Sequence, residues 1–468
     1  MSLLSRHRRA RWAAITAVAA AAGVACASAV SAAPATPAAA DRAAKHAPVI
    51  KHTGKAPTGY EVTFELYAPD AERVQIKGEW YFARPSELDP YAGTPEDPVV
   101  ESPGIMPADW QAGDFPLASP NSTNPNWPVV DMVERGNSGV WTYTTPLPGG
   151  TFTYAYYVDC ETADQSGCTP VADPSNLAWN VGDDGESAGS VVPNSQIYVP
   201  ADADFDPSDT SWQEPVADGG TLELVTYDSP GHVSPVDENY MVVYTPPGYD
   251  AGRAEPYPTL YLSHGGGEDA LGWSTQGALA PIMDNLIMSG EVQPMVVVMP
   301  NGNGYPASTE NEAFRTDLIG TVFPYMEAHY NVSTEAADRA FSGLSAGGMR
   351  TNQLMLYNTD AFDYYGMMSA GMPPGTTLSD QQIADLQEAS IFVGGGWQDV
   401  IHAVGFSIGT RQLHTGPLNE VRLLTDAGIH VSTDFVNGGH NWSVWRTLLR
   451  DFTTRVAFLP PTSAPPTS

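Results

Sequence analysis

Basic residues are scarce in this chain, and lysine is nearly absent. The 468 residues contain 54 acidic but only 21 basic side chains, so the formal net charge is −33. Lysine occurs only at Lys45, Lys51, Lys55 and Lys77. A surface this acidic argues against nucleic acid and anionic membranes as partners, because both carry negative charge. The absence of lysine after Lys77 also argues against a serine–lysine catalytic dyad in the later part of the chain.

Cysteine is equally rare, with residues only at Cys26, Cys160 and Cys168. Cys160 and Cys168 have seven residues between them. In an exported protein, this spacing within a loop predicts a local disulfide. No further cysteine or nearby histidine completes a metal site around the pair. We therefore expect neither a metal nor another cofactor.

The only long apolar run lies near the N-terminus, at residues 12–25, and four arginines precede it. It is too short for an ordinary membrane span. Small residues follow and end in Val30-Ser31-Ala32, which is typical of a cleavage site. The pattern predicts a secretory signal peptide over residues 1–32 and hence an extracellular protein without a membrane partner. The arginine pair at 8–9 fits both general and twin-arginine export.

The sequence pattern of the remaining chain changes near residue 220. Residues 33–56, rich in Ala, Pro and Lys, predict a flexible leader. Residues 57–200 contain alternating segments such as "YEVTFELYAP", "RVQIKGEWYF" and "TFTYAYYVD", which predict a small β-sandwich. An acidic linker is expected over residues 201–220 and a disordered tail over residues 459–468.

Beyond residue 220, apolar segments alternate with helical stretches. The segments "YPTLYLSHGGG", "PMVVVMP" and "SIFVGGG" predict buried strands. A helix is expected over residues 280–289, ended by Gly290, and another over residues 314–330. Buried strands that alternate with helices predict a mostly parallel sheet covered on both faces. Residues 221–458 should therefore form one α/β domain.

One serine is surrounded by small residues in "FSGLSAGGMR", residues 341–350. The stretch fits G-x-S-x-G with Ser345 at its centre, between a predicted short strand and a predicted helix. In a nucleophile elbow the serine occupies a strained turn between such elements. Small neighbours then let the strand and the helix pack closely. The pattern predicts Ser345 as a nucleophile.

A serine hydroxyl needs a base, which an acid in turn orients. In α/β-hydrolases the acid and the histidine follow the serine, each in a loop after a strand. His440 lies in such a loop, within "NGGHNWSVW", and Asp399 follows the strand "SIFVGGG". Asp363, Asp426 and Asp434 compete for the role of the acid. Asp434 lies inside a predicted strand and the other two in or beside helices, which favours Asp399.

The oxyanion of an acyl-transfer intermediate needs two backbone N–H donors. Ala346, directly after the candidate nucleophile, should supply one. The other should come from "HGGG", residues 264–267, which follows the predicted strand "TLYLS". Gly266 is the preferred donor, with Gly265 and Gly267 as alternatives.

Four tryptophans lie near these motifs and are candidates for walls around an acyl group. They are Trp273, Trp397, Trp442 and Trp445. Such walls would favour an aromatic acyl group over acetate. Core packing is the alternative role for each of them.

Five separated blocks resemble the esterase-D-like group, which includes carbohydrate esterase family one with its feruloyl and acetylxylan esterases. The blocks are "VVYTPPGYD", "YPTLYLSHGGGEDALGW", "MDNLIMSGEVQPMVVVMPNG", "FSGLSAGGMR" and "VNGGHNWSVWR". The resemblance implies an α/β-hydrolase fold, with the family's triad at Ser345, Asp399 and His440. It also implies the oxyanion donors Gly266 and Ala346. The first domain resembles an early-set immunoglobulin-like module, in which Trp80, Tyr81 and Trp141 are either glycan-stacking or core residues.

The resemblance implies a secreted serine carboxylesterase. Its substrate would be an acylated polysaccharide, carrying feruloyl, cinnamoyl or acetyl groups in the plant cell wall, or a small ester. Siderophore esterases of the enterochelin type, polyester hydrolases and mycolyltransferase-like acyltransferases are alternatives within the same chemistry. A non-catalytic binding protein that keeps the fold is a further alternative. All the candidate catalytic groups lie after residue 220, so we expect the first domain to be dispensable for the hydrolysis of small esters. No pattern specifies the oligomeric state.

Overall fold

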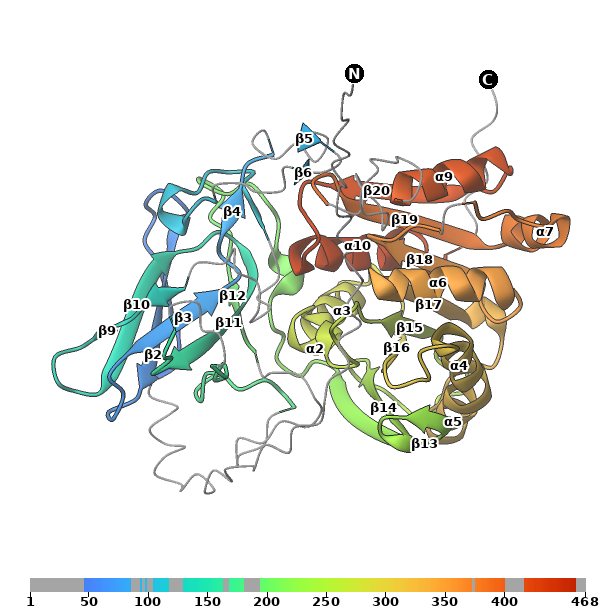
Figure 1. The fold of residues 1–468 in the computed structure, drawn as a ribbon, viewed down its shortest axis with the longest axis horizontal. Helices are drawn as coiled ribbons and strands as arrows, with labels where there is room; N and C mark the ends of the chain where they lie inside the picture. The colour runs from blue at the N-terminus through green and yellow to red at the C-terminus, as the bar shows by residue number, and fades with distance from the viewer. Residues whose placement is uncertain are drawn as a thin grey trace, which may run out of the picture.

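The computed structural model describes residues 46–85, 104–117, 129–162, 168–180, 194–372, 375–399 and 416–459, and two short strands at 93–94 and 97–98. The predicted signal peptide, the leader up to residue 45 and the predicted tail beyond Leu459 lie outside these residues. Figure 1 shows an all-β unit, drawn in blue to green, beside a larger α/β unit, drawn in green to red.

The N-terminal unit has two four-stranded antiparallel sheets in its described part. The first has the order β1-β2-β10-β9, with β1 (Val49–His52), β2 (Tyr60–Tyr67), β10 (Val140–Pro146) and β9 (Val133–Glu134). The second has the order β12-β11-β3-β8, with β12 (Ser195–Val199), β11 (Gly150–Val158), β3 (Val74–Gly78) and β8 (Val130–Asp131). Two small two-stranded antiparallel sheets accompany them: β4 (Phe82–Ala83) with β7 (Phe115–Pro116), and β5 (Gly93–Thr94) with β6 (Asp97–Pro98).

Apolar side chains from both sheets form one core, as the alternation along β2 requires. Val62, Phe64 and Leu66 of β2 point inward, and the residues between them are less buried. Trp80 is completely buried there and packs against Phe64, with 5.0 Å between the ring centroids. Trp80 therefore has a packing role and offers no surface to a glycan.

β1 lies within the stretch predicted as a leader. Its four residues are exposed and carry no alternation, so the sequence pattern gave no strand signal. Backbone pairing with β2, from Val49 opposite Thr63 to His52 opposite Tyr60, nevertheless orders it. The predicted disulfide between Cys160 and Cys168 is confirmed, with 5.6 Å between the Cα atoms.

Residues 201–220, predicted as an acidic linker, contact both units: Asp202 is 2.8 Å from His52 of the N-terminal unit, and Asn285 of the larger unit donates to the carbonyl of Glu214 at 2.7 Å. A short 3₁₀-helix (Ser211–Gln213) carries Trp212, which is buried in the core of the α/β unit. The Trp212 indole N–H donates to the carbonyl of Asp209 at 2.9 Å. Apolar burial of this tryptophan anchors the connection.

The α/β unit is built on an eight-stranded sheet of order β13-β14-β16-β15-β17-β18-β19-β20. Its strands are β13 (Thr221–Val233), β14 (Val236–Thr245), β15 (Thr259–Ser263), β16 (Val296–Pro300), β17 (Arg339–Leu344), β18 (Tyr364–Met368), β19 (Ser390–Gly396) and β20 (Val431–Val436). β13, β14 and β16 pair antiparallel, and every pair from β16 to β20 is parallel. The predicted α/β sheet is thus confirmed, with an antiparallel edge.

Helices cover both faces of this sheet (Figure 1). On the face toward the N-terminal unit lie α2 (Gly272–Thr275), α3 (Leu279–Met288) and α10 (Trp442–Arg455). The other helices are α4 (Glu310–Asp317), α5 (Phe323–His329), α6 (Ala346–Tyr357), α7 (Asp380–Glu388) and α9 (Pro417–Asp426). A five-residue π-helix (Leu318–Val322) joins α4 to α5, and Pro324 in the first turn of α5 cannot donate a helical hydrogen bond. A 3₁₀-helix (Ala336–Asp338) precedes β17.

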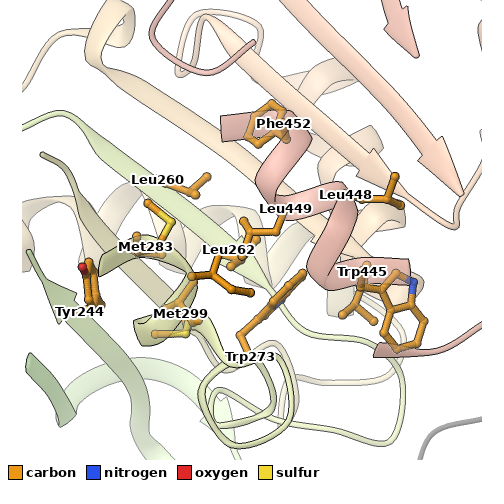
Figure 2. Close-up of a cluster of buried hydrophobic side chains, with 14 of the residues drawn as sticks. Tyr244, Leu260, Leu262, Trp273, Met283, Met299, Trp445, Leu448, Leu449 and Phe452 are labelled. Carbon is orange, nitrogen blue, oxygen red and sulfur yellow. The ribbon is translucent and has the colours of Figure 1, made fainter. Parts of the chain in front are cut away.

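The core between the sheet and α10 is built from large apolar side chains. Figure 2 shows Leu449 of α10 directed toward Leu262 of the sheet. Trp445, Leu448 and Phe452 of the same helix belong to the same buried cluster. These α10 residues recur at helical spacing, and each is at most 3% exposed. The core therefore fixes the helix that follows directly after His440.

Candidate active site

Ser345 occupies the sharp turn that the G-x-S-x-G pattern predicts. It lies between β17 and α6 with φ 51° and ψ −113°, a region that side chains other than glycine rarely adopt. Its backbone N–H donates to the carbonyl of Met368 at 2.8 Å, which holds the turn. A Cβ at Gly347 would lie 2.4 Å from the carbonyl oxygen of Ser263. The glycine is therefore required because α6 starts directly against β15.

The structure brings His440 and Asp399 together. His440 Nδ1 and Asp399 Oδ2 are 2.9 Å apart, and Asp399 is buried while the His440 side chain is 28% exposed. Asp399 follows β19 and His440 follows β20, so both lie at the carboxyl edge of the sheet where β17 delivers Ser345. The three candidates therefore share one edge of the sheet, as the order serine, acid, histidine predicts.

The competing acids lie elsewhere. Asp426 is on α9 against Arg422, at 3.3 Å. Asp434 is on β20, 3.8 Å from Arg455. Asp363 precedes β18, and its backbone carbonyl accepts from Ser390 N–H at the opposite edge of the sheet. Of the four aspartates, Asp399 is the one whose carboxylate is bonded to His440.

Gln398 links the acid loop to the histidine loop. Its backbone N–H donates to the carbonyl of Gly438 at 3.0 Å, and its side-chain oxygen accepts from the N–H of Gly438 at 2.8 Å. Gly438 has φ +147°, and an added Cβ there would lie 2.3 Å from Val444. The two loops are thus held in register beside the Asp399–His440 hydrogen bond.

Electrostatics around His440 favour its protonated form. Burial of the ring lowers the pKa of His440, but the carboxylates of Asp399 and Glu268 outweigh this effect and raise the pKa above the ordinary value of 6.5. The His440 and Trp445 rings form a T-shaped pair, with 4.9 Å between centroids and an interplanar angle of 89°. The site can therefore hold an imidazolium, which a general base becomes after it accepts a proton.

Residues 264–267 form a loop against the start of α6. A Cβ at Gly265 would lie 3.6 Å from Ser345 Cβ, and one at Gly266 would lie 3.9 Å from Ala346 Cβ. The N–H of Gly265 already donates to Glu268 Oε2 at 3.2 Å. The occupied N–H argues against Gly265 as an oxyanion donor and favours Gly266. Ala346 is the first residue of α6, so its N–H has no intrahelical acceptor.

His264 anchors this loop as a neutral side chain. Its Nδ1–H donates to the carbonyl of Gly265 at 2.7 Å, and its Nε2 accepts from the N–H of Gly302 at 2.9 Å. The Arg350 guanidinium donates to the carbonyls of His264 and Gly302 at 3.2 and 3.0 Å. Burial, together with the charge of Arg350, lowers the pKa of His264 to about 3.

Glu268 and Arg350 were not singled out from the sequence. Each stands in a quoted motif: Glu268 follows "HGGG", and Arg350 ends "FSGLSAGGMR". Burial raises the pKa of Glu268 to about 7, although the N–H of Gly265 opposes this shift. Both residues could have been found from the sequence, because each is a charged side chain next to or at the end of a glycine-rich motif.

Most of the predicted tryptophan wall is core. Trp273 and Trp442 are completely buried and Trp445 is 3% exposed, so they pack beneath the loops and offer almost no surface to a ligand. Trp273 and Trp442 meet edge to face, with 5.2 Å between centroids. Trp397 is 41% exposed and lies 5.2 Å from the Phe435 ring. Of the four, Trp397 is the one available to a substrate.

Within the described residues, no group of three or more His, Cys, Asp or Glu side chains is arranged to hold a metal ion. The helices of the described part are all too short or too polar to cross a membrane.

The α/β unit matches a known protein family. Residues 236–455 match the model of a family described as "Putative esterase". This stretch runs from β14 to the last residue of α10 and contains Ser345, Asp399 and His440.

Curated relatives match over part of the chain. An endo-1,4-beta-xylanase/feruloyl esterase of Xylanibacter ruminicola is 31% identical over 280 residues, which cover 57% of this chain and 34% of that protein. Endo-1,4-beta-xylanase Y of Acetivibrio thermocellus is 28% identical over 200 residues, which cover 40% of this chain and 18% of that protein. This chain thus spans about a third of the length of the first relative and less of the second.

A solved structure has a similar overall fold. The enterobactin esterase of Shigella flexneri aligns with a TM-score of 0.52 and 15% identity, over 87% of this chain and 95% of that one. At 15% identity the likeness shows the fold alone. Because the alignment covers 87% of this chain, it includes part of the N-terminal unit. Together the comparisons show that the α/β unit is similar to esterases, and the likeness in fold agrees with an α/β-hydrolase-like sheet.

Proposed function

We propose that the protein is a secreted serine carboxylesterase that works through an acyl-enzyme on Ser345. The observation that carries the proposal is the 2.9 Å hydrogen bond between His440 and Asp399, at the sheet edge where Ser345 occupies its strained turn. A positioned imidazole with a buried carboxylate behind it activates a serine hydroxyl. Secretion is supported by the N-terminal signal pattern in residues 1–32.

The proposed reaction has two steps. His440 Nε2 accepts the proton of Ser345 Oγ as the oxygen attacks the ester carbonyl, and the resulting oxyanion accepts from the N–H groups of Gly266 and Ala346. His440 then returns the proton to the leaving alcohol, which leaves an acyl-enzyme. Water attacks this ester by the same route and releases the acid. Asp399 keeps the neutral imidazole in the Nδ1–H tautomer and stabilises the imidazolium that forms after proton transfer. The proposed reaction needs no cofactor.

Feruloyl or related cinnamoyl esters of plant cell-wall polysaccharide are the substrates we favour, followed by acetyl esters. The named activity of the Xylanibacter relative supports this choice, and the exposed indole of Trp397 is suited to an aromatic acyl group. The N-terminal unit is proposed to be an immunoglobulin-like module, because its two antiparallel sheets enclose a single core. The enterobactin esterase shares the fold, so cleavage of a siderophore lactone is the second candidate.

The substrate assay compares acids released at equal enzyme concentration. Ferulate from feruloylated arabinoxylan is expected to exceed acetate from acetylated xylan. Replacing Trp397 with alanine should lower ferulate release and leave acetate release nearly unchanged, because acetate is too small to stack. Cleavage of a siderophore lactone or a polyester without release of either acid would contradict the polysaccharide assignment. Transfer of the acyl group to added sugar in excess of hydrolysis would instead identify an acyltransferase.

A pH profile tests the charges around His440. Values of kcat/KM for a small nitrophenyl ester are expected to rise as His440 loses its proton, with a midpoint above 6.5 because Asp399 and Glu268 raise its pKa. Glu268→Gln removes one of the two charges, so the midpoint should move to lower pH. Glu238→Gln, an exposed site at the β13–β14 hairpin, is the matched control and should leave it unchanged. An unshifted midpoint in Glu268→Gln would rule out the electrostatic role.

A further inference from the structure

The N-terminal unit contacts α10 through a completely buried ion pair. Arg446 of α10 and Glu79, which follows β3, are 1% and 0% exposed, with 2.9 Å between Nη2 and Oε2. Arg446 also donates to the carbonyl of Thr151 on β11 at 2.6 Å, and to the carbonyl of Gln276 in its own unit at 3.0 Å. One guanidinium therefore joins both units to the helix that follows His440.

A second contact lies beside His440 itself. Asn441 is the N-cap of α10, where its side-chain oxygen accepts from the N–H of Val444 at 3.3 Å. The amide nitrogen of the same side chain donates to the carbonyl of Pro116 on β7. On the other side of His440, a Cβ at Gly439 would lie 3.4 Å from the carbonyl oxygen of Leu117. The N-terminal unit thus bonds to the residue after His440 and lies close to the residue before it.

A gain in folding stability does not by itself explain why this ion pair is buried. Burial raises the pKa of Glu79 even though the adjacent Arg446 charge opposes the shift. Buried pairs of this kind are often no more stabilising than well-packed apolar residues. A guanidinium does, however, impose a planar set of directional bonds that an apolar contact lacks. The pair is therefore suited to fixing the orientation of α10.

We propose that the N-terminal unit positions His440 for catalysis. Glu79 and Thr151 fix α10 through Arg446, and Pro116 fixes its cap through Asn441, so that His440 keeps its hydrogen bond to Asp399. Glu79, Arg446 and Asn441 are positioning residues, since each acts through α10 or its cap. The inference rests on the proposed function, and it replaces the expectation that the first domain is dispensable for small esters.

Two substitutions test the two contacts separately. Glu79→Gln keeps the size of the side chain and an acceptor for Arg446 but removes the charge. Asn441→Ser keeps a cap acceptor for the N–H of Val444 but is too short to reach Pro116. Each variant is expected to lower kcat for a small nitrophenyl ester about 10- to 100-fold. KM should change by less than about two-fold, because the contact acts on the chemical step.

The pKa of His440 supplies a readout independent of turnover. NMR titration of the ring protons should give a lower pKa in both variants than in the wild type, because the bond to Asp399 is weakened. Val62→Ala is the control, since it removes methyl groups from the core of the sandwich without touching α10. It should lower Tm while kcat and the pKa of His440 stay at wild-type values.

The outcomes separate this inference from the proposed function. If folded Glu79→Gln and Asn441→Ser keep both kcat and the His440 pKa, the contacts are merely structural and the inference is wrong. Should Glu79→Gln fail to fold, Asn441→Ser decides by the same two measurements. If the wild type neither hydrolyses esters nor reacts with a fluorophosphonate at Ser345, the proposed function fails, and the titrations still test the positioning of His440.

Discussion

Ser345→Ala is expected to abolish ester hydrolysis while the fold is retained. Removing a triad nucleophile typically lowers kcat by about 10⁶-fold, because the acyl-enzyme cannot form. The turn at Ser345 depends on its backbone bond to Met368, which alanine preserves. Steady-state hydrolysis of a nitrophenyl ester, together with far-UV circular dichroism and Tm, measures both parts of the expectation.

The matched control is Ser342→Ala, the same change three residues earlier on β17. The Ser342 hydroxyl donates to the carbonyl of Gly366 at 2.9 Å inside the sheet, away from the turn. This variant should lose some stability and keep its activity. A fluorophosphonate should label the wild type and Ser342→Ala but not Ser345→Ala. Near-normal hydrolysis by folded Ser345→Ala would refute the proposed mechanism.

Asp399→Asn should have the second largest effect, a decrease in kcat of about 10⁴-fold. The amide keeps the shape of the side chain, but its nitrogen can donate to His440 Nδ1 and so select the wrong tautomer. The pKa of His440 should fall as well, because a charge that raises it is lost. The pH dependence of kcat and an NMR titration of His440 measure these two effects.

Asp426→Asn and Asp363→Asn serve as controls at the competing positions. Asp426 lies on α9 and is exposed beside Arg422, and Asp363 precedes β18, so both variants should retain activity. Retention of most of the rate by Asp399→Asn would mean that another acid orients His440. The two control variants would then identify which one.

The sequence predicts well those parts of the structure that depend on neighbouring residues, such as the turn at Ser345 and the buried parallel strands. Ser345 was recognisable because a strand, a serine among glycines and a helix are adjacent in the chain, and the parallel strands showed as continuous apolar runs. The Asp399–His440 pair followed from strand order, since successive parallel strands deliver their loops to one edge. β1 was missed because it is a short exposed edge strand, ordered by its partner rather than by its own pattern.

Contacts between distant parts of the chain were not predictable in this way. Glu79 and Arg446 are 367 positions apart, and nothing in their neighbours distinguishes them from surface charges. The position of a tryptophan near a motif in the sequence likewise does not predict whether its side chain points into the core or toward the surface. Trp273 and Trp442 proved to be core residues, whereas Trp397 lies at the surface. Both failures arise because tertiary packing, and not local spacing, decides the burial of these side chains.

The bonds made by His264 have a consequence for how the site responds to acid. Both of its ring nitrogens are engaged, and its pKa of about 3 keeps it uncharged throughout the range in which His440 gains its proton. Lowering the pH into the range where His440 is protonated therefore leaves the charge and the hydrogen bonds of His264 unchanged. His264 then gives residues 264–267 no reason to change conformation. In the proposed reaction the two imidazoles would therefore have separate roles: His264 would hold the loop in place, and His440 would transfer the proton.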